Sequence, residues 1–150
     1  MTRAIIIGAP RSGSGKTSVT IGILRALARR GIKVRGAKSG PDYIDPGFHT
    51  AATGLSGVNL DSWAMSPDLL NALAGNATED ADFIFLESAM GLFDGIPAGQ
   101  GRTGSAADLA RLYHLPVLLV LDVSGQSTPA PAPPPRFFHQ HPAAGAFKQK

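Results

Sequence analysis

A glycine-rich segment, Pro10-Arg-Ser-Gly-Ser-Gly-Lys-Thr17, carries the residue types that bind the phosphates of a nucleotide. Gly13 and Gly15 allow backbone N–H groups to close around phosphate oxygens. Lys16 is placed to contact the β- and γ-phosphates, and the Thr17 hydroxyl is placed to bind Mg²⁺. We therefore predict a site for ATP and Mg²⁺. Its predicted nucleotide-binding residues are Ser12, Gly13, Ser14, Gly15, Lys16, Thr17 and Ser18.

The segment departs at one position from the strict pattern GxxxxGK[ST], which has glycine where this chain has Pro10. A flexible glycine turn without a ligand is the alternative interpretation. An apolar run at residues 4–8 precedes the loop, and helical spacing of apolar residues follows it over residues 18–30. A strand, a glycine loop and a helix in this order are the context in which such a loop binds phosphate, so the sequence favours nucleotide binding.

Glu87 closes the apolar run at residues 82–87, which predicts a strand. In open α/β sheets, ligand sites gather at the carboxyl ends of the strands. A carboxylate there, level with the glycine-rich loop, is suited to hold Mg²⁺ directly or through water. A solvated acid at a strand end is the alternative for this residue considered alone.

Two further segments bring carboxylates to the same region. Asp42 and Asp45 lie three residues apart in Lys38-Ser-Gly-Pro-Asp-Tyr-Ile-Asp-Pro-Gly-Phe-His49, which is rich in proline and glycine. Asp94 lies in Met90-Gly-Leu-Phe-Asp-Gly95, a few residues after the third predicted strand. Each segment alone is also compatible with an ordinary turn whose acids are solvated.

Strand and helix patterns alternate along the first 125 residues. Such alternation predicts a parallel sheet with right-handed crossovers, in a three-layer α/β domain of the P-loop NTPase type. The run PVLLVLD at residues 116–122 is continuously apolar, so we expect it to be covered on both faces. Ser66 and Ser105 are expected to cap helices. We expect strands at 4–8, 32–37, 82–87 and 116–122, helices at 18–30, 66–75 and 105–114, and mostly irregular chain at 38–59.

Composition and charge exclude several classes of function. Residues 1–125 carry equal numbers of basic and acidic side chains, so the formal charge of +3 comes from Arg136, Lys148 and Lys150. A nucleic-acid binder concentrates its basic excess on the folded module, so we predict no nucleic-acid partner. No run approaches the ~20 apolar residues of a membrane span, and the first residues do not fit a signal peptide, so we expect a cytoplasmic protein. The chain has no cysteine, which excludes a cysteine nucleophile within it.

Residues 126–150 differ in character from the preceding chain. They hold half of the 12 prolines and no acidic residue, and Pro133–Pro135 block the helix expected after the fourth strand. We predict that this segment is disordered and lies outside the family pattern described next. A natural proline-rich linker is one explanation, and loss of the reading frame or artificial truncation is the one we favour.

Several motifs together resemble the cobyrinate (or hydrogenobyrinate) a,c-diamide synthase family. The resemblance runs in uninterrupted order from about residue 4 to residue 125, and its long motifs are highly specific. It rests on Ala9-Pro10, Lys38-x-Gly-Pro-Asp-Tyr-Ile-Asp-Pro-x-Phe-His49, Asn59-Leu60-Asp61-x-Trp63, Glu87-x-x-Met-Gly-Leu-Phe-Asp-Gly95, Ala107-Asp-Leu-Ala110 and Leu115-Pro-Val117. Residues 1–125 are thus expected to be the N-terminal part of an ATP-binding synthetase domain with a fold like that of dethiobiotin synthetase.

The resemblance implies an amidoligase of cobalamin biosynthesis. ATP would phosphorylate the a and c carboxylates of a cobyrinic or hydrogenobyrinic acid, and ammonia would displace the phosphate. The implied Mg²⁺ ligands are Thr17, Asp42 and Glu87. The implied catalytic residues are Lys16, Asp45 and Asp94, and the residues implied for the corrin pocket are Asp42, Tyr43 and Ile44.

The chain also departs from this family. Family members continue into a glutamine amidotransferase domain with a cysteine nucleophile, whereas this chain has no cysteine. We therefore expect a fragment whose ammonia comes from a glutaminase domain absent here, and a homodimer is compatible with the resemblance. The alternatives are a dethiobiotin-synthetase-like ligase, a partition-type ATPase, which would have a second lysine where Arg11 stands, and a nucleotide-binding remnant without turnover.

Overall fold

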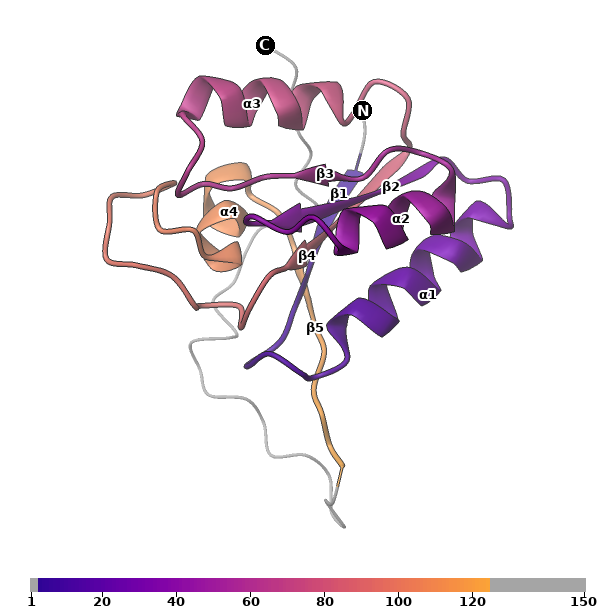
Figure 1. Cartoon of the computed structure of the whole chain (residues 1–150), viewed down its shortest axis with the longest axis horizontal. Coiled ribbons are helices and arrows are strands. Elements are labelled where there is room, and N and C mark those ends of the chain that lie inside the picture. Colours follow the sequence, from indigo (N-terminus) through magenta and orange to yellow (C-terminus); the bar gives the residue numbers. More distant parts are fainter. Residues whose placement is uncertain (1–2, 125–150) are drawn as a thin grey trace.

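The computed structural model describes residues 3–124, and within them four helices alternate with five strands (Figure 1). Every pair of neighbouring strands is parallel. This confirms the predicted three-layer α/β fold with a parallel sheet. The elements are β1 (Arg3–Gly8), α1 (Lys16–Ala28), β2 (Val34–Ser39), α2 (Asp45–Thr53), β3 (Val58–Asn59), α3 (Pro67–Asn76), β4 (Phe83–Ser88), α4 (Ala106–Tyr113) and β5 (Val117–Leu119).

The strand order is β3-β2-β4-β1-β5, so β4 lies in the middle of the sheet. Its neighbours are aligned with it in register: Glu87 faces Ile7 of β1 on one side and Lys38 of β2 on the other. The carboxyl ends of these three strands therefore meet at one edge of the sheet. The loops that follow them start side by side there, which is the usual place of a ligand site in such sheets.

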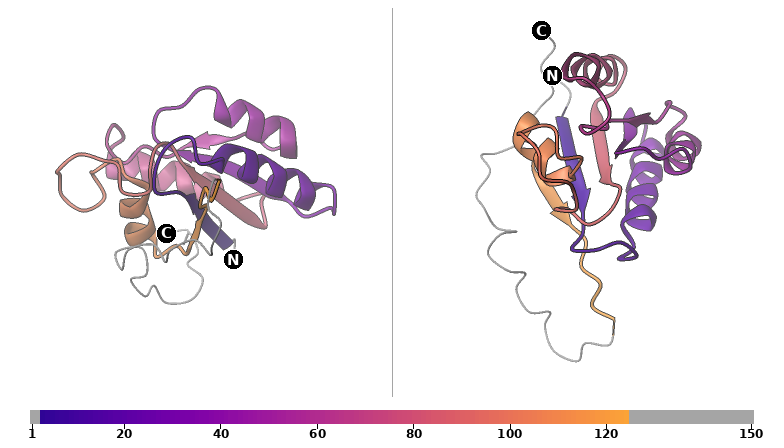
Figure 2. Two further views of the ribbon diagram at one scale, coloured as in Figure 1. Left: turned by 90° about the horizontal axis from the view of Figure 1, so that it is seen from below. Right: turned by 60° about the vertical axis from the view of Figure 1, so that its left-hand side comes forward.

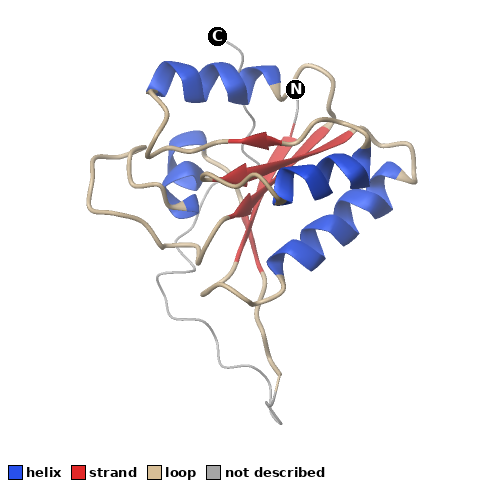
Figure 3. Ribbon diagram, viewed as in Figure 1, coloured by secondary structure: helices blue, strands red, loops and turns tan. Residues whose placement is uncertain are grey.

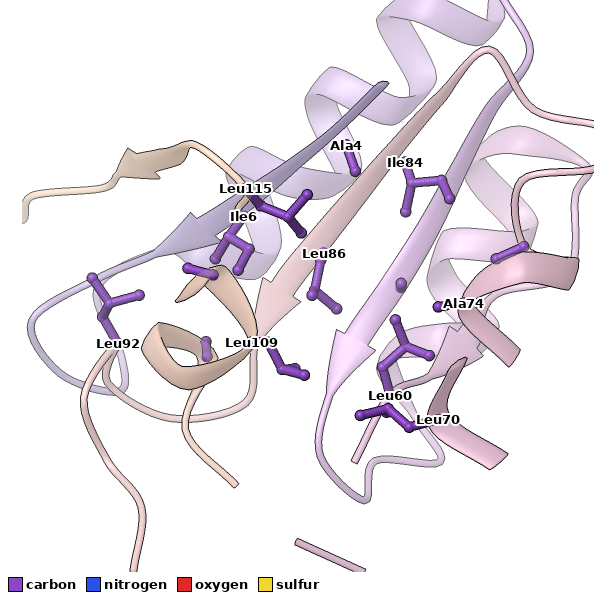
Figure 4. Packing of buried hydrophobic residues seen from close by; sticks show 14 residues of the cluster. Ala4, Ile6, Leu60, Leu70, Ala74, Ile84, Leu86, Leu92, Leu109 and Leu115 are labelled. Carbon is purple, nitrogen blue, oxygen red and sulfur yellow. The ribbon is translucent and has the colours of Figure 1, made fainter. Parts of the chain in front are cut away.

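Helices cover both faces of the sheet (Figure 2). Because side chains of a strand alternate between faces, Ile6 and Ile7 enter different cores. The core under α3 and α4 is the larger one (Figure 4). The core under α1 and α2 contains Ile7, Leu24, Val34, Ala52 and Phe85. The core under α3 and α4 includes Ala4, Ile6, Leu60, Leu70, Ala74, Ile84, Leu86, Leu92, Leu109 and Leu115.

The helix starts follow from local chemistry. The Ser66 hydroxyl accepts a hydrogen bond from Leu69 N at 3.3 Å, and the Ser105 hydroxyl accepts one from Asp108 N at 3.2 Å. Each hydroxyl satisfies a backbone N–H that the first turn of a helix leaves free, as the sequence predicts. Helix α1 has no such side chain, because the left-handed Gly15 of the glycine-rich loop stands at its N-cap position.

The prediction of irregular chain over residues 38–59 is wrong. This stretch contains the last two residues of β2, helix α2 and strand β3 (Figure 3). Pro46 fits the first turn of α2, where its missing N–H has no partner to lose. The buried side chains of His49 and Ala52 pack the helix onto the rest of the domain, so tertiary contacts stabilise a helix that its sequence alone does not indicate.

The strand predicted at residues 116–122 is present, but the prediction is wrong about its length and about its being covered on both faces. Strand β5 comprises Val117–Leu119, and Leu118 and Leu121 are each 37% exposed. Among the described residues β5 pairs with β1 alone and is an edge strand. A continuously apolar run is typical of a central strand, but within residues 3–124 the sheet ends here.

Other boundaries move by one or two residues. Helix α1 begins at Lys16, which brings Lys16 and Thr17 into its first turn, and β2 extends to Ser39. None of the helices within residues 3–124 is both long enough and apolar enough to cross a membrane. The predictions for residues 126–150 lie outside the described residues.

Candidate nucleotide and metal site

A pocket opens at the carboxyl ends of β2 and β4, beside the loop that joins β1 to α1. Its volume is about 400 Å³. The glycine-rich loop forms one wall, and the ends of β2 and β4 with the start of α2 form the other. The lining residues are Ser12, Gly13, Gly15, Lys16, Thr17, Ser18, Lys38, Asp42, Asp45, Glu87 and Ala89.

The glycine-rich loop has the backbone that its sequence predicts. Gly13 and Gly15 have φ angles of 75° and 84°, in the left-handed region that glycine adopts without strain. The carbonyl of Arg11 accepts hydrogen bonds from Ser14 Oγ at 3.1 Å and from Lys16 Nζ at 3.3 Å. The loop is thus closed on itself by contacts between residues at most five positions apart.

The ammonium of Lys16 lies in a partly desolvated place. Burial, followed by the positive charge of Lys38, lowers the pKa of Lys16 below its ordinary value, and Glu87, Asp94 and Asp45 oppose this shift. Within residues 3–124, Nζ donates one hydrogen bond, and its acceptor is the neutral carbonyl of Arg11. An anionic ligand in the pocket would relieve this electrostatic cost.

Glu87 is fully buried, and three side chains from three elements hold its carboxylate. Oε1 accepts hydrogen bonds from Thr17 Oγ1 at 2.5 Å and from Lys38 Nζ at 2.9 Å. Oε2 lies 3.1 Å from His49 Nε2. Burial alone would raise the pKa of Glu87, but the hydrogen bonds from His49, Thr17 and Lys38 outweigh it and hold this pKa below its ordinary value. The carboxylate is therefore ionised at neutral pH.

Lys38 joins Glu87 to the acidic segment. Its ammonium forms an ion pair with Asp45, in addition to the one with Glu87, and lies 3.7 Å from Asp42 Oδ2. Burial opposes the charged form, but the hydrogen bonds to Asp45 and Glu87 outweigh it and raise the pKa of Lys38. We refer to Thr17, Lys38, Asp45, His49 and Glu87 as the Glu87 cluster.

Asp42 shapes the start of α2. Its Oδ1 accepts hydrogen bonds from Ile44 N at 2.8 Å and Asp45 N at 3.0 Å. Burial works against ionisation, yet these backbone bonds outweigh it and lower the pKa of Asp42. Asn59 Nδ2 donates to the Asp42 carbonyl at 2.7 Å and ties the segment to β3.

The structure brings most of the predicted site residues together and leaves a few apart. Ser14 is buried in the loop and does not line the pocket, and neither does Asp94, whose Oδ2 accepts from Gly91 N at 2.8 Å. Tyr43 and Ile44 are 92% and 53% exposed and also lie outside the lining. The side chains of Tyr43 and Ile44 are therefore accessible from solvent outside the pocket.

Lys38 and His49 both lie in the motif at residues 38–49, but neither was predicted to have a role of its own. The signal that was available is their position at its two ends. Lys38 directly follows the strand predicted at residues 32–37, and His49 lies four residues after Asp45, a spacing that puts both on the same face of a helix. Because the helix itself was not predicted, this spacing had no structural meaning.

The described residues contain no group of three or more His, Cys, Asp or Glu side chains placed to hold a metal ion. Oxygen donors nevertheless converge: Thr17 Oγ1 lies 2.5 Å from Glu87 Oε1 and 3.5 Å from Asp45 Oδ2. Of the two acids in the segment, Asp45 thus hydrogen-bonds Thr17, while Asp42 is bonded to backbone amides. A hydroxyl with carboxylates is the donor chemistry that Mg²⁺ prefers, so the residues fit this ion.

The chain is similar in sequence to several curated proteins that share one name. A relative from Mesorhizobium japonicum, named hydrogenobyrinate a,c-diamide synthase, is 87% identical over 130 residues, which cover 87% of this chain and 30% of the relative. Relatives of the same name come from Agrobacterium fabrum (72% over 140 residues; 93% of this chain, 32% of the relative) and Rhodobacter capsulatus (54% over 132 residues; 87% and 30%). The chain spans roughly 30% of the length of the curated relatives it matches.

These matches confirm the resemblance inferred from the motifs. The match to the Agrobacterium relative covers more of the chain than residues 1–125 supply, so part of the proline-rich segment aligns with it too. Residues 5–115 match the family described as the CobQ/CobB/MinD/ParA nucleotide binding domain. Since the matched region includes the glycine-rich loop and the whole Glu87 cluster, the chain belongs to this family of nucleotide-binding domains.

Proposed function

We propose that the chain serves the ATP- and Mg²⁺-dependent amidation of the a and c carboxylates of a corrin acid, hydrogenobyrinic or cobyrinic acid, in cobalamin biosynthesis. The relatives' name supports the substrate and the reaction. The observation that carries the proposal is the Glu87 carboxylate. It joins Thr17 of the glycine-rich loop to Lys38 at the acidic segment, so the phosphate side and the acceptor side of one pocket share a buried anion.

The chemistry suits this arrangement. A carboxylate is a poor electrophile until it is phosphorylated. In the first step a carboxylate oxygen of the corrin attacks the γ-phosphorus of ATP, the bond to the β–γ bridging oxygen breaks and ADP leaves. In the second step ammonia attacks the acyl carbon, inorganic phosphate leaves and the nitrogen loses a proton. Such a transfer depends on alignment and charge neutralisation, and Lys16 and Lys38 bring two ammonium groups to the pocket.

Mg²⁺ would be held by Thr17 and Glu87, with Asp42 or Asp45 completing the protein ligands, because these oxygens face the pocket. When bound, the ion would neutralise and align the β- and γ-phosphates. The remaining predicted roles belong to the same proposal: Asp45 and Asp94 on the acceptor side, and Tyr43 and Ile44 beside Asp42 against the corrin.

Ammonia would come from outside this chain. The sequence has no cysteine, so a cysteine nucleophile that releases ammonia from glutamine would be supplied by another segment or polypeptide. We also propose that the protein is cytoplasmic, that it forms a homodimer, and that it binds neither nucleic acid nor membrane.

The test is to incubate the chain with hydrogenobyrinic acid, or in parallel with cobyrinic acid, together with ATP and Mg²⁺, and to follow the corrin by mass. With ammonium we expect slow formation of amides that ceases when ATP or Mg²⁺ is omitted. With glutamine as the nitrogen source we expect no product. Clear glutamine-driven product would overturn the ammonia assignment, and failure of the chain to bind ATP at all would overturn the whole proposal.

A further inference from the structure

His49 is a fully buried histidine on α2 that the proposed reaction does not use. It does not line the pocket. Its Nε2 lies 3.1 Å from Oε2 of Glu87, and because that carboxylate is ionised and accepts only, Nε2 is the donor. The other ring nitrogen, Nδ1, is buried and has no hydrogen-bond partner among the described residues. Within the part of the chain that the structure describes, the hydrogen bond to Glu87 is therefore the one polar contact of the imidazole.

The two oxygens of Glu87 have separate tasks. Oε1 accepts from Thr17 and Lys38, which both line the pocket, whereas Oε2 is bonded to His49, which does not line it. Rotation of this fully buried carboxylate would break both sets of bonds. A buried acceptor left without its donor destabilises the folded state, and the loss is greater when the acceptor is charged. The bond from His49 thus holds the carboxylate in the orientation that presents Oε1 to Thr17.

The imidazole is itself fixed by packing. A Cβ placed on Gly36 of β2 would lie 2.4 Å from Cβ and 2.5 Å from Cγ of His49, so the ring lies directly against the strand backbone. Only glycine leaves this space. The position of the Nε2 donor is consequently set by how α2 packs on β2, not by another hydrogen bond.

We propose that His49 is a positioning residue for Glu87, and that it sets the affinity of the site for the divalent cation that accompanies the nucleotide. This inference rests on the proposed role of Glu87 and Thr17 as ligands of Mg²⁺. Groups that hydrogen-bond a metal's ligands orient them, and their removal typically lowers metal affinity by about 10- to 100-fold.

Two substitutions separate positioning from packing. In His49→Gln the side-chain amide nitrogen falls near the place of Nε2 and can still donate to Glu87. In His49→Asn the nitrogen falls near the place of Nδ1 and cannot reach it. For both variants and the unaltered chain, calorimetry gives the affinity of a nonhydrolysable ATP analogue without metal, and titration with Mn²⁺ or Mg²⁺ gives the affinity of the metal for the nucleotide complex.

We expect His49→Asn to lower metal affinity at least tenfold while the metal-free affinity for the nucleotide changes less than twofold, and His49→Gln to recover most of the loss. Equal metal affinity in His49→Asn and the unaltered chain would overturn the inference. So would an equal loss in both variants, or a matching loss of metal-free binding. If the unaltered chain itself binds nucleotide without any response to metal, the proposed function fails instead.

A measurement without substitution covers the case in which both variants unfold. In the unaltered chain, the imidazole ¹⁵N resonances of His49 report its bond to Glu87. Addition of Mg²⁺ to the complex with the ATP analogue should shift them, because the carboxylate then shares its charge with the ion. Unchanged His49 resonances under saturating Mg²⁺ would overturn the inference.

Discussion

The two walls of the pocket are built in opposite ways. The glycine-rich loop is local: its hydrogen bonds to the Arg11 carbonyl come from Ser14 and Lys16, three and five residues away. The Glu87 cluster is assembled from distant parts of the chain. Glu87 is bonded to His49, Lys38 and Thr17, which precede it by 38, 49 and 70 positions, respectively. A nucleotide site thus combines a wall that a short peptide can encode with a wall that exists only when β2, β4 and α2 have packed together.

The lysines of the two walls show the same contrast in their electrostatics. Burial and the neighbouring Lys38 lower the pKa of Lys16, whereas hydrogen bonds to Asp45 and Glu87 outweigh burial and raise the pKa of Lys38. Lys38 is therefore a structural cation whose charge the folded state needs. Lys16 carries its charge at a cost that a bound phosphate would offset.

The largest expected effect is on stability and belongs to Lys38. Lys38→Met removes the ammonium that both Glu87 and Asp45 contact, and it leaves two carboxylates without their cation. Breaking a buried pair by removing one partner costs about 3–5 kcal/mol, so we expect the free energy of unfolding to fall by about 3 kcal/mol in urea at neutral pH. Lys16→Met is the matched control, and we expect a change below about 1 kcal/mol. Equal losses in the two variants would contradict the contrast between the walls.

The next effect is on binding and belongs to Lys16. Lys16→Ala removes the ammonium placed to contact the β- and γ-phosphates. We expect the affinity for ATP to fall at least tenfold, or about 1.4 kcal/mol, as measured by titration with a fluorescent ATP analogue. Urea unfolding of the same variant should remain close to that of the unaltered chain. Equal nucleotide affinity of variant and unaltered chain would remove the assignment of the phosphate site.

This contrast also explains what the sequence could predict. Ser12–Ser18 were assigned from a contiguous pattern whose chemistry lies in its own backbone. Seven of the nine elements within residues 3–124 lie within a few residues of their predicted positions, and α2 and β3 are the two that were not predicted. Glu87 was predicted as a site residue because it closes an apolar run and so marks the carboxyl end of a strand. The roles of Lys38 and His49 were missed because they depend on the register of β2 against β4 and on a helix that forms through packing.

The predictions for the regions of helix α2 and strand β5 differ from the structure for related reasons. In α2 the local signals are Pro46 and Gly47, which indicate a turn, and the burial of Ala52 against α1 and the sheet overrides them. In β5 the apolar pattern correctly indicates a strand, but pattern alone does not tell an edge from a centre. Both errors concern long-range packing, which periodicity does not encode.

In alkaline solution we expect a smaller effect, namely a pH dependence of the free energy of unfolding that has opposite signs for Lys16 and Lys38. Lys16 binds its proton less tightly in the folded state, so its contribution to stability rises with pH from its lowered pKa up to the ordinary value of 10.5. Lys38 binds its proton more tightly in the folded state. Its contribution is fully present below 10.5 and is lost as the pH rises through its raised pKa.

Urea unfolding from about pH 8 to pH 11 checks this prediction. The free energy of the unaltered chain minus that of Lys16→Met should increase with pH below 10.5, and the difference from Lys38→Met should decrease above it. Taking differences removes the contributions of other groups, such as Tyr113, whose pKa burial raises to about 12. Two differences with the same slope would show that the lysines are not in contrasting environments.

The smallest expected effect concerns Arg11, and it decides between two kinds of P-loop protein. A partition-type ATPase would use a cationic side chain at this loop position to contact phosphate. Here the Arg11 side chain is 72% exposed, and its guanidinium lies 3.2 Å from Asp122 Oδ2. The loop uses only the Arg11 carbonyl, which every residue type retains. Arg11→Ala should therefore leave ATP affinity within twofold and cause no measurable change in urea unfolding, because exposed ion pairs contribute little. Asp122→Asn breaks the same pair from its other end, so a tenfold loss of ATP affinity in Arg11→Ala alone would mean that the arginine contacts phosphate and would favour the partition-type alternative.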